Sequence, residues 1–391
     1  MDTYIDGYTL TSALGSGLEA MRSALRNDQT GLSGEPWPDC DVPCYLGRVA
    51  ALDDPRCEAA LPAARRSRNN ALIALALQQD GFGDRVARAV ERYGADRVGL
   101  VMGTSTSSID RTEQAYQQLD VDGRFSPEYR QPLTHNPHAP GDFVAASLAL
   151  QGPQITISAA CASSAKVFAT AQRWLQQNLV DAVVVGGADT LCLSVIYGFH
   201  SLQLVAPEPC RPFAPDRTGI SLGEAAGFVL LQRETPGSES LQLLGAGESC
   251  DAYHMSSAHP EGLGAQLSME RALQAAQLTM ADIDYVNLHG TGTRANDATE
   301  GKVCGAMIGP HTLASATKGW TGHTLGAAGI VESILSLDAL RTGWVPGTRN
   351  TVESDAPFEL LLESRAAAPR TALSNSFGFG GNNCSVVFAR S

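Results

Sequence analysis

The stretch ITISAACASSAKVFATAQRWL, residues 155–175, joins a strand pattern to a helix pattern through a single cysteine, Cys161. A short β-type run ends in small residues, and a helical pattern follows over 162–177. A thiol at a helix N-terminus faces backbone N–H groups, which lower its pKa and stabilise the thiolate that attacks carbonyl groups. The junction therefore favours a nucleophilic cysteine, and a buried structural cysteine is the alternative.

Similar strand and helix patterns alternate along the whole chain. Buried strands are predicted at DRVGLVMGT, PQITIS, DAVVVGGAD, GFVLLQ, IDYVNLHGT and NCSVVF, and helices at 70–79, 162–177, 265–276 and 325–341. This alternation indicates an α/β protein whose sheets are covered on both faces. The polar segment RETPGSES, 233–240, predicts a division into residues 1–235 and 236–391, each with one helix that starts in small residues.

Composition excludes several classes of protein. The chain has 391 residues, a net charge of −13 and only three lysines, which argues against nucleic-acid binding. Nine cysteines show no metal-binding spacing beyond the lone pair Cys40 and Cys44, so no metal is expected. The N-terminus lacks the pattern of a signal peptide and no apolar run is long enough to span a membrane, so we expect a soluble, cytoplasmic protein.

Three further motifs carry side chains suited to chemistry. NLHGTGTRANDATE, 287–300, ends a strand at His289 and places Thr291 and Thr293 in a glycine loop. ATKGWTGH, 316–323, supplies Lys318 and His323. Read alone, each histidine suits a structural role and the lysine an exposed surface position.

The fourth motif is the glycine-rich segment LSNSFGFGGNNCSVVF, 373–388, which leads into the last predicted strand. Its backbone N–H groups could bind an oxyanion, and Phe377 and Phe379 could gate a pocket. A plain turn before the strand is the alternative.

Together, ACASSA, HGTGT, TKGWTGH and GFGG occur in the order found in the elongating β-ketoacyl-acyl-carrier-protein synthases, type II condensing enzymes of the thiolase superfamily, which the chain resembles from end to end. The resemblance implies a thiolase-like layered αβαβα sandwich of two similar halves, with the nucleophilic cysteine in the first and both catalytic histidines in the second. It also implies a dimer and a decarboxylative Claisen condensation in fatty acid, polyketide or polyene biosynthesis.

The resemblance assigns a role to each matching residue. Cys161 would carry the acyl chain as a thioester, and His289 and His323 would support decarboxylation of a malonyl thioester and stabilise its enolate. The further implied assignments are Lys318 as the charge that orients the network, backbone N–H groups of Cys161 and Phe379 as oxyanion hole, Phe379 and Phe377 as gate, Thr291 and Thr293 as pantetheine contacts, and Glu332 and Asp297 as supporting acids. No cofactor is implied beyond the 4′-phosphopantetheine of the acyl carrier protein.

A carrier protein of this pathway class is acidic, so an acidic enzyme needs a local basic dock. We expect that dock at Arg65, Arg66 and Arg68, together with Arg124, and a solvated helix start is the alternative. The chain departs from the family at Ser164, at Gly319–Trp320 and in the polar segment PLTHNPHAPGDF, 132–143, which suggests an unusual acyl chain or a heteromeric partner.

Two other functions remain as alternatives. A non-catalytic chain-length subunit, which shapes a partner's pocket, typically lacks the nucleophile, whereas this chain has Cys161. A cysteine hydrolase would need a general base and access for water. The chain could also be the active subunit of a heterodimer with a ketosynthase-like partner.

Overall fold

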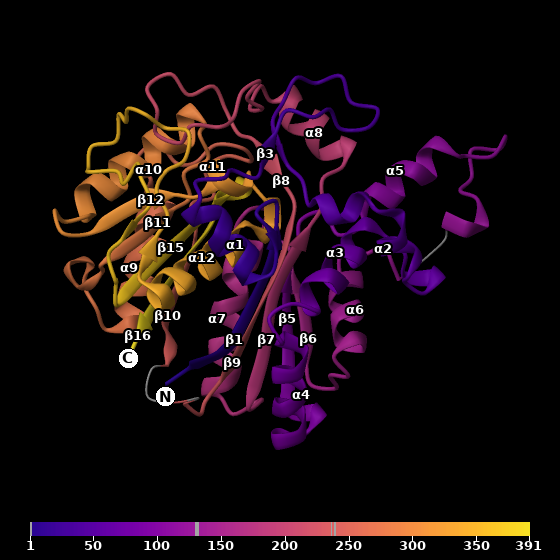
Figure 1. The fold of residues 1–391 in the computed structure, drawn as a ribbon, viewed down its shortest axis with the longest axis horizontal. Helices are drawn as coiled ribbons and strands as arrows, with labels where there is room; N and C mark the ends of the chain where they lie inside the picture. The colour runs from indigo at the N-terminus through magenta and orange to yellow at the C-terminus, as the bar shows by residue number, and fades with distance from the viewer. Residues whose placement is uncertain (1, 130–132, 236, 238–239) are drawn as a thin grey trace.

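The computed structural model describes residues 2–129, 133–235, 237 and 240–391. Figure 1 shows five layers: helices, sheet, a central pair of helices, sheet and helices again. The central core contains residues of both sheets and of both central helices. Two further apolar clusters lie between each sheet and its outer helices. The predicted layered α/β fold is confirmed.

In the part of the chain that the structure describes, the main sheet has eleven strands: two similar sets of five, which form the two sheet layers and are called the first and second sheets, and β2 (Gly15–Ser16), which pairs with β1. The first set has the order β1-β9-β7-β5-β6 and the second β10-β16-β15-β11-β12, and they meet through a short antiparallel pairing of β1 with β10. In each set the last three strands named are parallel and the first three are antiparallel. The bounds are β1 Tyr4–Ser12, β5 Val98–Gly103, β6 Gln154–Ile157, β7 Ala182–Asp189, β9 Ala225–Gln232, β10 Leu241–Cys250, β11 Tyr285–Leu288, β12 Leu313–Ala316, β15 Thr371–Gly378 and β16 Asn382–Arg390.

The central helices are α7, Ser163–Gln176, and α12, Ala328–Thr342 (Figure 1). Helices α3 Arg68–Leu77, α4 Phe82–Tyr93 and α6 Ala139–Ser147 cover the outer face of the first sheet, and α9 Leu263–Ala276 and α10 Arg294–Met307 cover that of the second. The helix predicted over 162–177 forms as α7. The helix predicted over 325–341 begins with a 3₁₀ turn, Leu325–Ala327, before α12.

Small residues let α7 and α12 approach closely. A Cβ on Gly329 of α12 would lie 2.4 Å from the backbone nitrogen of Ala165 on α7. Ser164, which departs from the family pattern, accepts a hydrogen bond of 2.9 Å from the Ile330 N–H. The serine is thus a link between the two halves, at the start of both central helices.

Shorter elements connect these layers. They are β2 Gly15–Ser16, α1 Leu18–Arg26, β3 Leu32–Ser33, β4 Leu46–Gly47, α2 Pro55–Ala59, α5 Ile109–Gln117, α8 Leu193–Ser201, β8 Leu222–Gly223, α11 Lys318–Thr321, β13 Trp344–Val345 and β14 Arg365–Ala366. Within the described chain, no helix is long and apolar enough to cross a bilayer. The division at 235/236 stays a prediction, and residue 236 lies outside the described residues.

Candidate active site

Cys161 lies in the turn between β6 and α7, buried at 7% exposure. The residue before it, Ala160, has φ of +49°, a conformation that non-glycine residues adopt rarely and at some energetic cost. The Ser163 hydroxyl supports this turn, because it donates to the Ala160 carbonyl at 2.6 Å and accepts from the Ala159 N–H at 2.8 Å. The strained turn holds the sulfur at the floor of a pocket.

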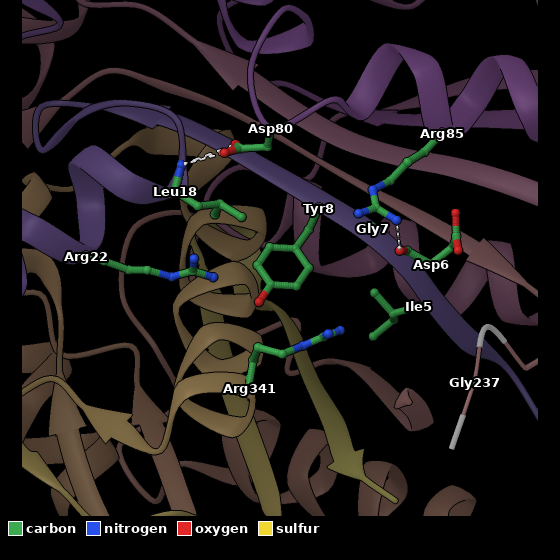
Figure 2. Close-up of a pocket in the computed structure, with 10 residues that line it drawn as sticks. All are labelled: Ile5, Asp6, Gly7, Tyr8, Leu18, Arg22, Asp80, Arg85, Gly237 and Arg341. Atoms are coloured by element: carbon green, nitrogen blue, oxygen red, sulfur yellow. Dashed lines mark hydrogen bonds between the residues drawn. The ribbon is translucent and has the colours of Figure 1, made fainter. Parts of the chain in front are cut away.

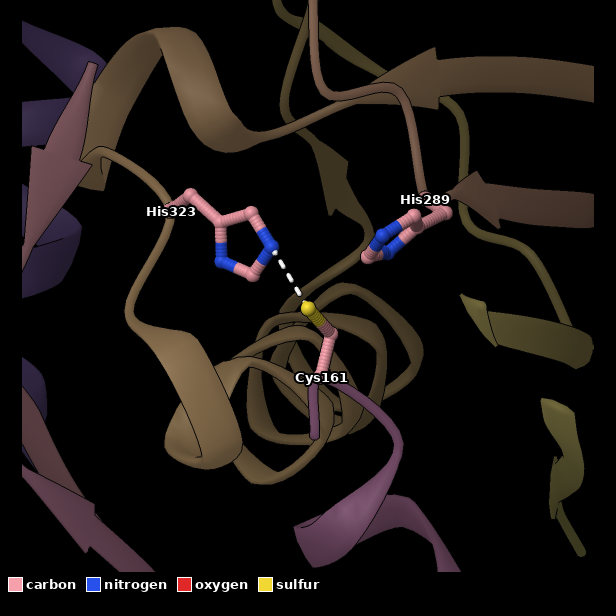
Figure 3. A group of neighbouring side chains, drawn as sticks. All are labelled: Cys161, His289 and His323. Carbon is pink, nitrogen blue, oxygen red and sulfur yellow. Dashed lines mark hydrogen bonds between the residues drawn. The ribbon is translucent and has the colours of Figure 1, made fainter. Parts of the chain in front are cut away.

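His323 lies in the loop between α11 and α12 and faces the cysteine (Figure 3). Its backbone pairs with β8, since the His323 N–H donates to the Ser221 carbonyl at 2.7 Å. Its Nε2 lies 3.1 Å from Cys161 Sγ, and its Nδ1 accepts the Leu325 N–H at 3.1 Å. Because Nδ1 is an acceptor, the neutral ring carries its proton on Nε2, which therefore donates toward the sulfur.

His289, at the end of β11, adopts the same tautomer through a different neighbour. Lys318 Nζ lies 3.1 Å from its Nδ1, and an ammonium group can only donate. The His289 proton is therefore also on Nε2. The two imidazole rings meet edge to face with centroids 5.4 Å apart, and one nitrogen of each comes within 4.8 Å of the sulfur (Figure 3). Two N–H donors thus serve one pocket.

Lys318 is held by a buried network. Its ammonium group donates to the His289 carbonyl at 2.5 Å and forms an ion pair with Glu332 of α12. Both side chains are almost fully buried. Burial raises the pKa of Glu332 to about 7, and the nearby Lys318 opposes that rise. Lys318 and Glu332 come together because the fold brings the start of α11 close to α12, and nothing in the sequence indicates that they pair.

The environment of Cys161 corrects one prediction. Burial raises the pKa of its thiol to about 11, whereas the helix N-terminus alone was expected to lower it. Lys318 and the backbone N–H groups of Phe379 and Cys161 act in the lowering direction but do not outweigh desolvation. Burial also lowers the pKa of His289 and of His323 well below 6.5, with Lys318 adding to the effect, so both rings are neutral at pH 7.

The glycine segment covers the pocket. Phe379 begins the 3₁₀ turn Phe379–Gly381 and stacks on Phe199 of α8 with ring centroids 5.8 Å apart. Phe377 packs at 5.9 Å against the His289 ring. The remaining pocket is narrow, about 100 Å³. Phe199 was missed in the sequence because nothing local distinguishes it from other aromatic residues on a helix.

The loop after His289 lines the pocket and is held by buried acids. The hydroxyl groups of Thr291 and Thr293 lie 2.9 Å apart and both residues line the pocket. Asp297 accepts the Phe213 and Gly292 N–H groups at 2.8 and 3.2 Å. It thereby braces the loop, and the supporting role in catalysis that the resemblance implies for it stays a prediction.

Glu300 is a supporting acid that sequence reasoning missed. Its two carboxylate oxygens accept the backbone N–H groups of His289 and Gly290, each at 2.8 Å. Burial raises its pKa to about 7. The only sequence signal was its place in the DATE segment, one helical turn after Asp297.

The spacing of Cys161, His289 and His323 also matches a metal-binding group. The donor set does not favour that use. Both Nδ1 atoms already accept hydrogen bonds, and the Lys318 ammonium group beside His289 repels a cation.

The structure argues against one of the four arginines predicted for the carrier dock. Arg68 forms an ion pair of 2.5 Å with the fully buried Glu224, so its charge is already neutralised, and its assignment to the dock was wrong. Arg66 donates to the carbonyls of Leu61 and Ala59 but remains exposed, as does Arg124. Arg65 is half-buried. These three arginines stay candidates.

A second, larger cavity of about 560 Å³ lies beside β1 and shares no lining residue with the Cys161 pocket. Arg22, Arg85 and Arg341 enter it from three helices (Figure 2). Arg22 is paired with Asp338 at 2.5 Å, and the Tyr8 hydroxyl also donates to Asp338. This cavity lies between α1, α4 and α12, and none of the residues that line it lines the Cys161 pocket.

Comparison with known proteins agrees with this geometry. The N-terminal domain of the β-ketoacyl synthase family matches residues 60–236, and its C-terminal domain matches residues 241–352. Nodulation protein E of Rhizobium meliloti (strain 1021) is 34% identical over 75% of each chain. The 3-oxoacyl-[acyl-carrier-protein] synthase 2 of Mycobacterium bovis is 30% identical over 99% of this chain and 96% of that protein.

Two solved structures are similar over the whole chain. The complex of the ketosynthase ApeO with its chain length factor ApeC from Xenorhabdus doucetiae matches at 37% identity and a TM-score of 0.87, covering 100% of this chain and 98% of that one. The ishigamide ketosynthase/chain length factor matches at 25% identity and a TM-score of 0.89, covering 100% and 99%. From the motifs, the thiolase-like fold and these matches, we conclude that the chain belongs to the β-ketoacyl synthase family of acyl-transferring condensing enzymes.

Proposed function

We propose that this chain is the catalytic subunit of a condensing enzyme and that Cys161 carries the acyl group. In the first half-reaction the sulfur attacks the carbonyl carbon of an acyl-carrier thioester. The C–S bond to pantetheine breaks, and the thiol proton of Cys161 ends on the departing pantetheine thiol. The N–H groups of Cys161 and Phe379, which act on the sulfur, are suited to hold the oxyanion of the tetrahedral intermediate.

In the second half-reaction a malonyl thioester loses CO₂, and the electrons of the broken C–C bond form an enolate. The Nε2–H groups of His289 and His323 donate to the enolate oxygen. The enolate carbon then attacks the acyl-Cys161 carbonyl, the C–S bond to Cys161 breaks, and a β-ketoacyl thioester two carbons longer leaves on the carrier. No cofactor besides the carrier's pantetheine takes part.

The observation that carries this proposal is the shared tautomer of the two histidines. Each Nδ1 already accepts a hydrogen bond, from the Leu325 N–H in His323 and from the Lys318 ammonium in His289. Neither ring then offers an unprotonated Nε2 that could remove a proton from water. Two donors and no general base favour stabilisation of an enolate over hydrolysis of the thioester.

The substrate arm enters past the glycine segment. Thr291 and Thr293 line the pocket and offer hydroxyl groups to the amide groups of pantetheine. Phe379 closes the entrance against Phe199, so a shift of the Phe379 turn is needed to admit an acyl chain. The carrier itself would dock through Arg65, Arg66 and Arg124. Reversing two of these charges should raise the KM for carrier-bound acyl chains, and an unchanged KM would remove them from the dock.

We also propose that the chain works as a dimer. Among the described residues, strand β6 pairs only with β5, so its other edge is open for pairing with another chain. Ile155 on β6 is 43% exposed, and an exposed apolar side chain on an open edge strand favours an interface there. The relatives ApeO and the ishigamide ketosynthase are paired with chain length factors. A related subunit on β6, in the cytoplasm, is therefore the expected partner, and a second copy of this chain is the alternative.

Intact-mass measurement after incubation with a panel of acyl-carrier proteins tests the proposal. Wild type should gain one acyl mass and Cys161→Ala none. His289→Ala should still gain the acyl mass, because His323, and not His289, forms the hydrogen bond with the sulfur. The same variant should form no β-keto product from malonyl carrier. Acylation of Cys161→Ala would overturn the assignment of the nucleophile.

A further inference from the structure

A buried carboxylate in the first half of the chain gathers a loop next to the active site. Asp189, at the end of β7, is fully buried and accepts hydrogen bonds from five donor groups of Thr104, Ser105 and Thr106. The donors are Thr104 Oγ1 at 2.6 Å, Ser105 N at 3.0 Å, Ser105 Oγ at 3.1 Å, Thr106 N at 2.9 Å and Thr106 Oγ1 at 2.6 Å. So many donors on one carboxylate fix the loop rigidly.

The carboxylate also sets the direction of the Ser105 hydroxyl. The Ser105 O–H donates to Asp189 Oδ2, which leaves the lone pairs of Ser105 Oγ as acceptors. The lone pairs of Ser105 Oγ then face the Gly326 N–H, which donates to them at 3.0 Å. The hydrogen bonds therefore form a chain in one direction: the Gly326 N–H donates to the Ser105 oxygen, and the Ser105 O–H donates to Asp189.

Gly326 follows the residue that fixes the tautomer of His323. Leu325 has φ of +58°, a strained conformation for leucine, and its N–H donates to His323 Nδ1 at 3.1 Å. Only glycine fits next in the chain, since a Cβ on Gly326 would lie 2.6 Å from both Asp189 Oδ2 and the Ser105 nitrogen. The strained turn is thus clamped at Gly326 by the first half of the chain.

We propose that Asp189 and Ser105 are positioning residues that keep His323 in its Nε2–H tautomer by anchoring the Leu325–Gly326 turn. The inference rests on the proposed function, in which that proton is donated to the enolate. Neither residue touches the sulfur or the substrate. The first half of the chain, which carries Cys161, thereby also controls the donor contributed by the second half.

The test compares Ser105→Ala, Ser105→Thr and Asp189→Asn with one matched control. Ser105→Ala removes the acceptor of the Gly326 N–H, and Ser105→Thr keeps a hydroxyl. The matched control is Thr312→Val, which removes a buried hydroxyl bound to the Ile283 carbonyl at 2.9 Å, before β11 and away from the pocket lining. Two readouts apply: kcat and KM for malonyl carrier, and the pH dependence of Cys161 alkylation by iodoacetamide.

We expect Ser105→Ala to lower kcat about tenfold with KM nearly unchanged, because the lost donor acts in the transition state. The pH at which Cys161 alkylation is half-maximal should rise, since the thiolate loses the His323 N–H. Ser105→Thr should stay within about threefold of wild type. Asp189→Asn should lower kcat more than Ser105→Ala does, because the NH₂ group of the asparagine would face N–H and O–H donors. Alkylation is read on the Cys161 peptide, since Cys40, Cys44, Cys57 and Cys250 are also accessible.

Equal kinetics and equal alkylation profiles for Ser105→Ala and Thr312→Val would overturn the inference. The two proposals fail separately. A wild-type protein that forms no β-keto product refutes the proposed function, while the alkylation profile still decides whether Ser105 acts on His323.

Discussion

The two active-site histidines reach the same protonation state by opposite means. The His289 loop is held by charges: the Lys318 ammonium donates to Nδ1, and the Glu300 carboxylate accepts two backbone N–H groups. The His323 loop is held by neutral groups near the ring, the Leu325 N–H and the pairing with β8. The Asp189 carboxyl group reaches this loop only through Ser105, which binds the Gly326 N–H.

This difference suits the two positions. His323 contacts the sulfur at 3.1 Å, where a neighbouring buried cation would hold the cysteine permanently as its thiolate partner. His289 stands farther from the sulfur, beside an ammonium group that makes its Nε2–H a stronger donor. Burial lowers the pKa of His289, and this ammonium group lowers it further. The comparison shows that the two loops use different contacts to hold the same Nε2–H tautomer, and that neither loop depends on a charged imidazole.

The largest expected effect comes from removing either ring. His289→Ala and His323→Ala should each lower the condensation rate by about 10² to 10³, the usual loss for one oxyanion donor. Only His323→Ala should also slow alkylation of Cys161 near neutral pH. Steady-state kinetics and peptide mass spectrometry measure the two effects, and equal alkylation of the two variants would contradict the division of roles.

Removing the charge behind His289 should affect stability as well as rate. Lys318→Met leaves Glu332 buried without its partner, which typically costs about 3–5 kcal/mol in the free energy of unfolding. The double variant Lys318→Met/Glu332→Gln should recover most of this stability but not the activity. Denaturant unfolding beside condensation assays separates the two, and recovery of activity in the double variant would show that the charge is dispensable.

The pH dependence of alkylation should separate the cysteine from the histidines. The pKa of Cys161 is raised to about 11, so its thiolate fraction, and with it the alkylation rate, should rise about tenfold per pH unit between pH 7 and 10. Both histidine pKa values are lowered below 6.5, so no inflection from imidazolium should appear between pH 6.5 and 8. Because the pKa of Glu332 is also raised to about 7 and Glu332 acts on the sulfur, the same profile is measured in Glu332→Gln, and an inflection that persists in that variant would place a charged histidine at the sulfur.

Glu300 should make stability depend on pH through the His289 loop. Its pKa is raised from 4.5 to about 7 in the folded protein, so folding binds a proton in that interval. The stabilising contribution is fully present below pH 4.5 and is lost as the pH rises through 7. The melting temperature of wild type should fall more between pH 5 and 7.5 than that of Glu300→Gln, and parallel curves would argue against the shift.

The smallest expected effect concerns the start of α12, behind the His323 loop. Ser164→Ala removes the acceptor of the Ile330 N–H and should cost about 1 kcal/mol of stability with little change in kcat. Thermal unfolding and kinetics test this. A large kcat loss would mean that α12 as a whole, and not the Ser105 contact alone, positions His323.

The sequence indicated the three side chains that the structure brings together, and to which we assign the chemistry, because each lies in a local pattern. Cys161 stands at a strand–helix junction, and His289 and His323 stand beside glycine loops, so small windows of sequence contain the signal. The α/β class followed from the alternation of strand and helix patterns in the same way, whereas the two similar halves were implied by the resemblance to a known family.

The supporting groups could not be predicted because their contacts span long stretches of chain. Asp189 binds a loop 85 residues earlier, and Ser105 binds Gly326, 221 residues later. Arg68 lies in a basic run of the sequence that suggested a solvated surface, but it forms an ion pair with the buried Glu224, 156 residues away. The rise of the Cys161 pKa has the same origin, since burial depends on the closed pocket and not on the helix that follows the cysteine.

The central claim is that both histidines are neutral Nε2–H donors. Nitrogen-15 NMR of histidine-labelled protein at pH 7, with His289→Ala and His323→Ala used for assignment, measures this directly. The account predicts a protonated Nε2 and an unprotonated, hydrogen-bonded Nδ1 for both residues. A proton on Nδ1 of either ring, or an imidazolium at either position, would contradict it.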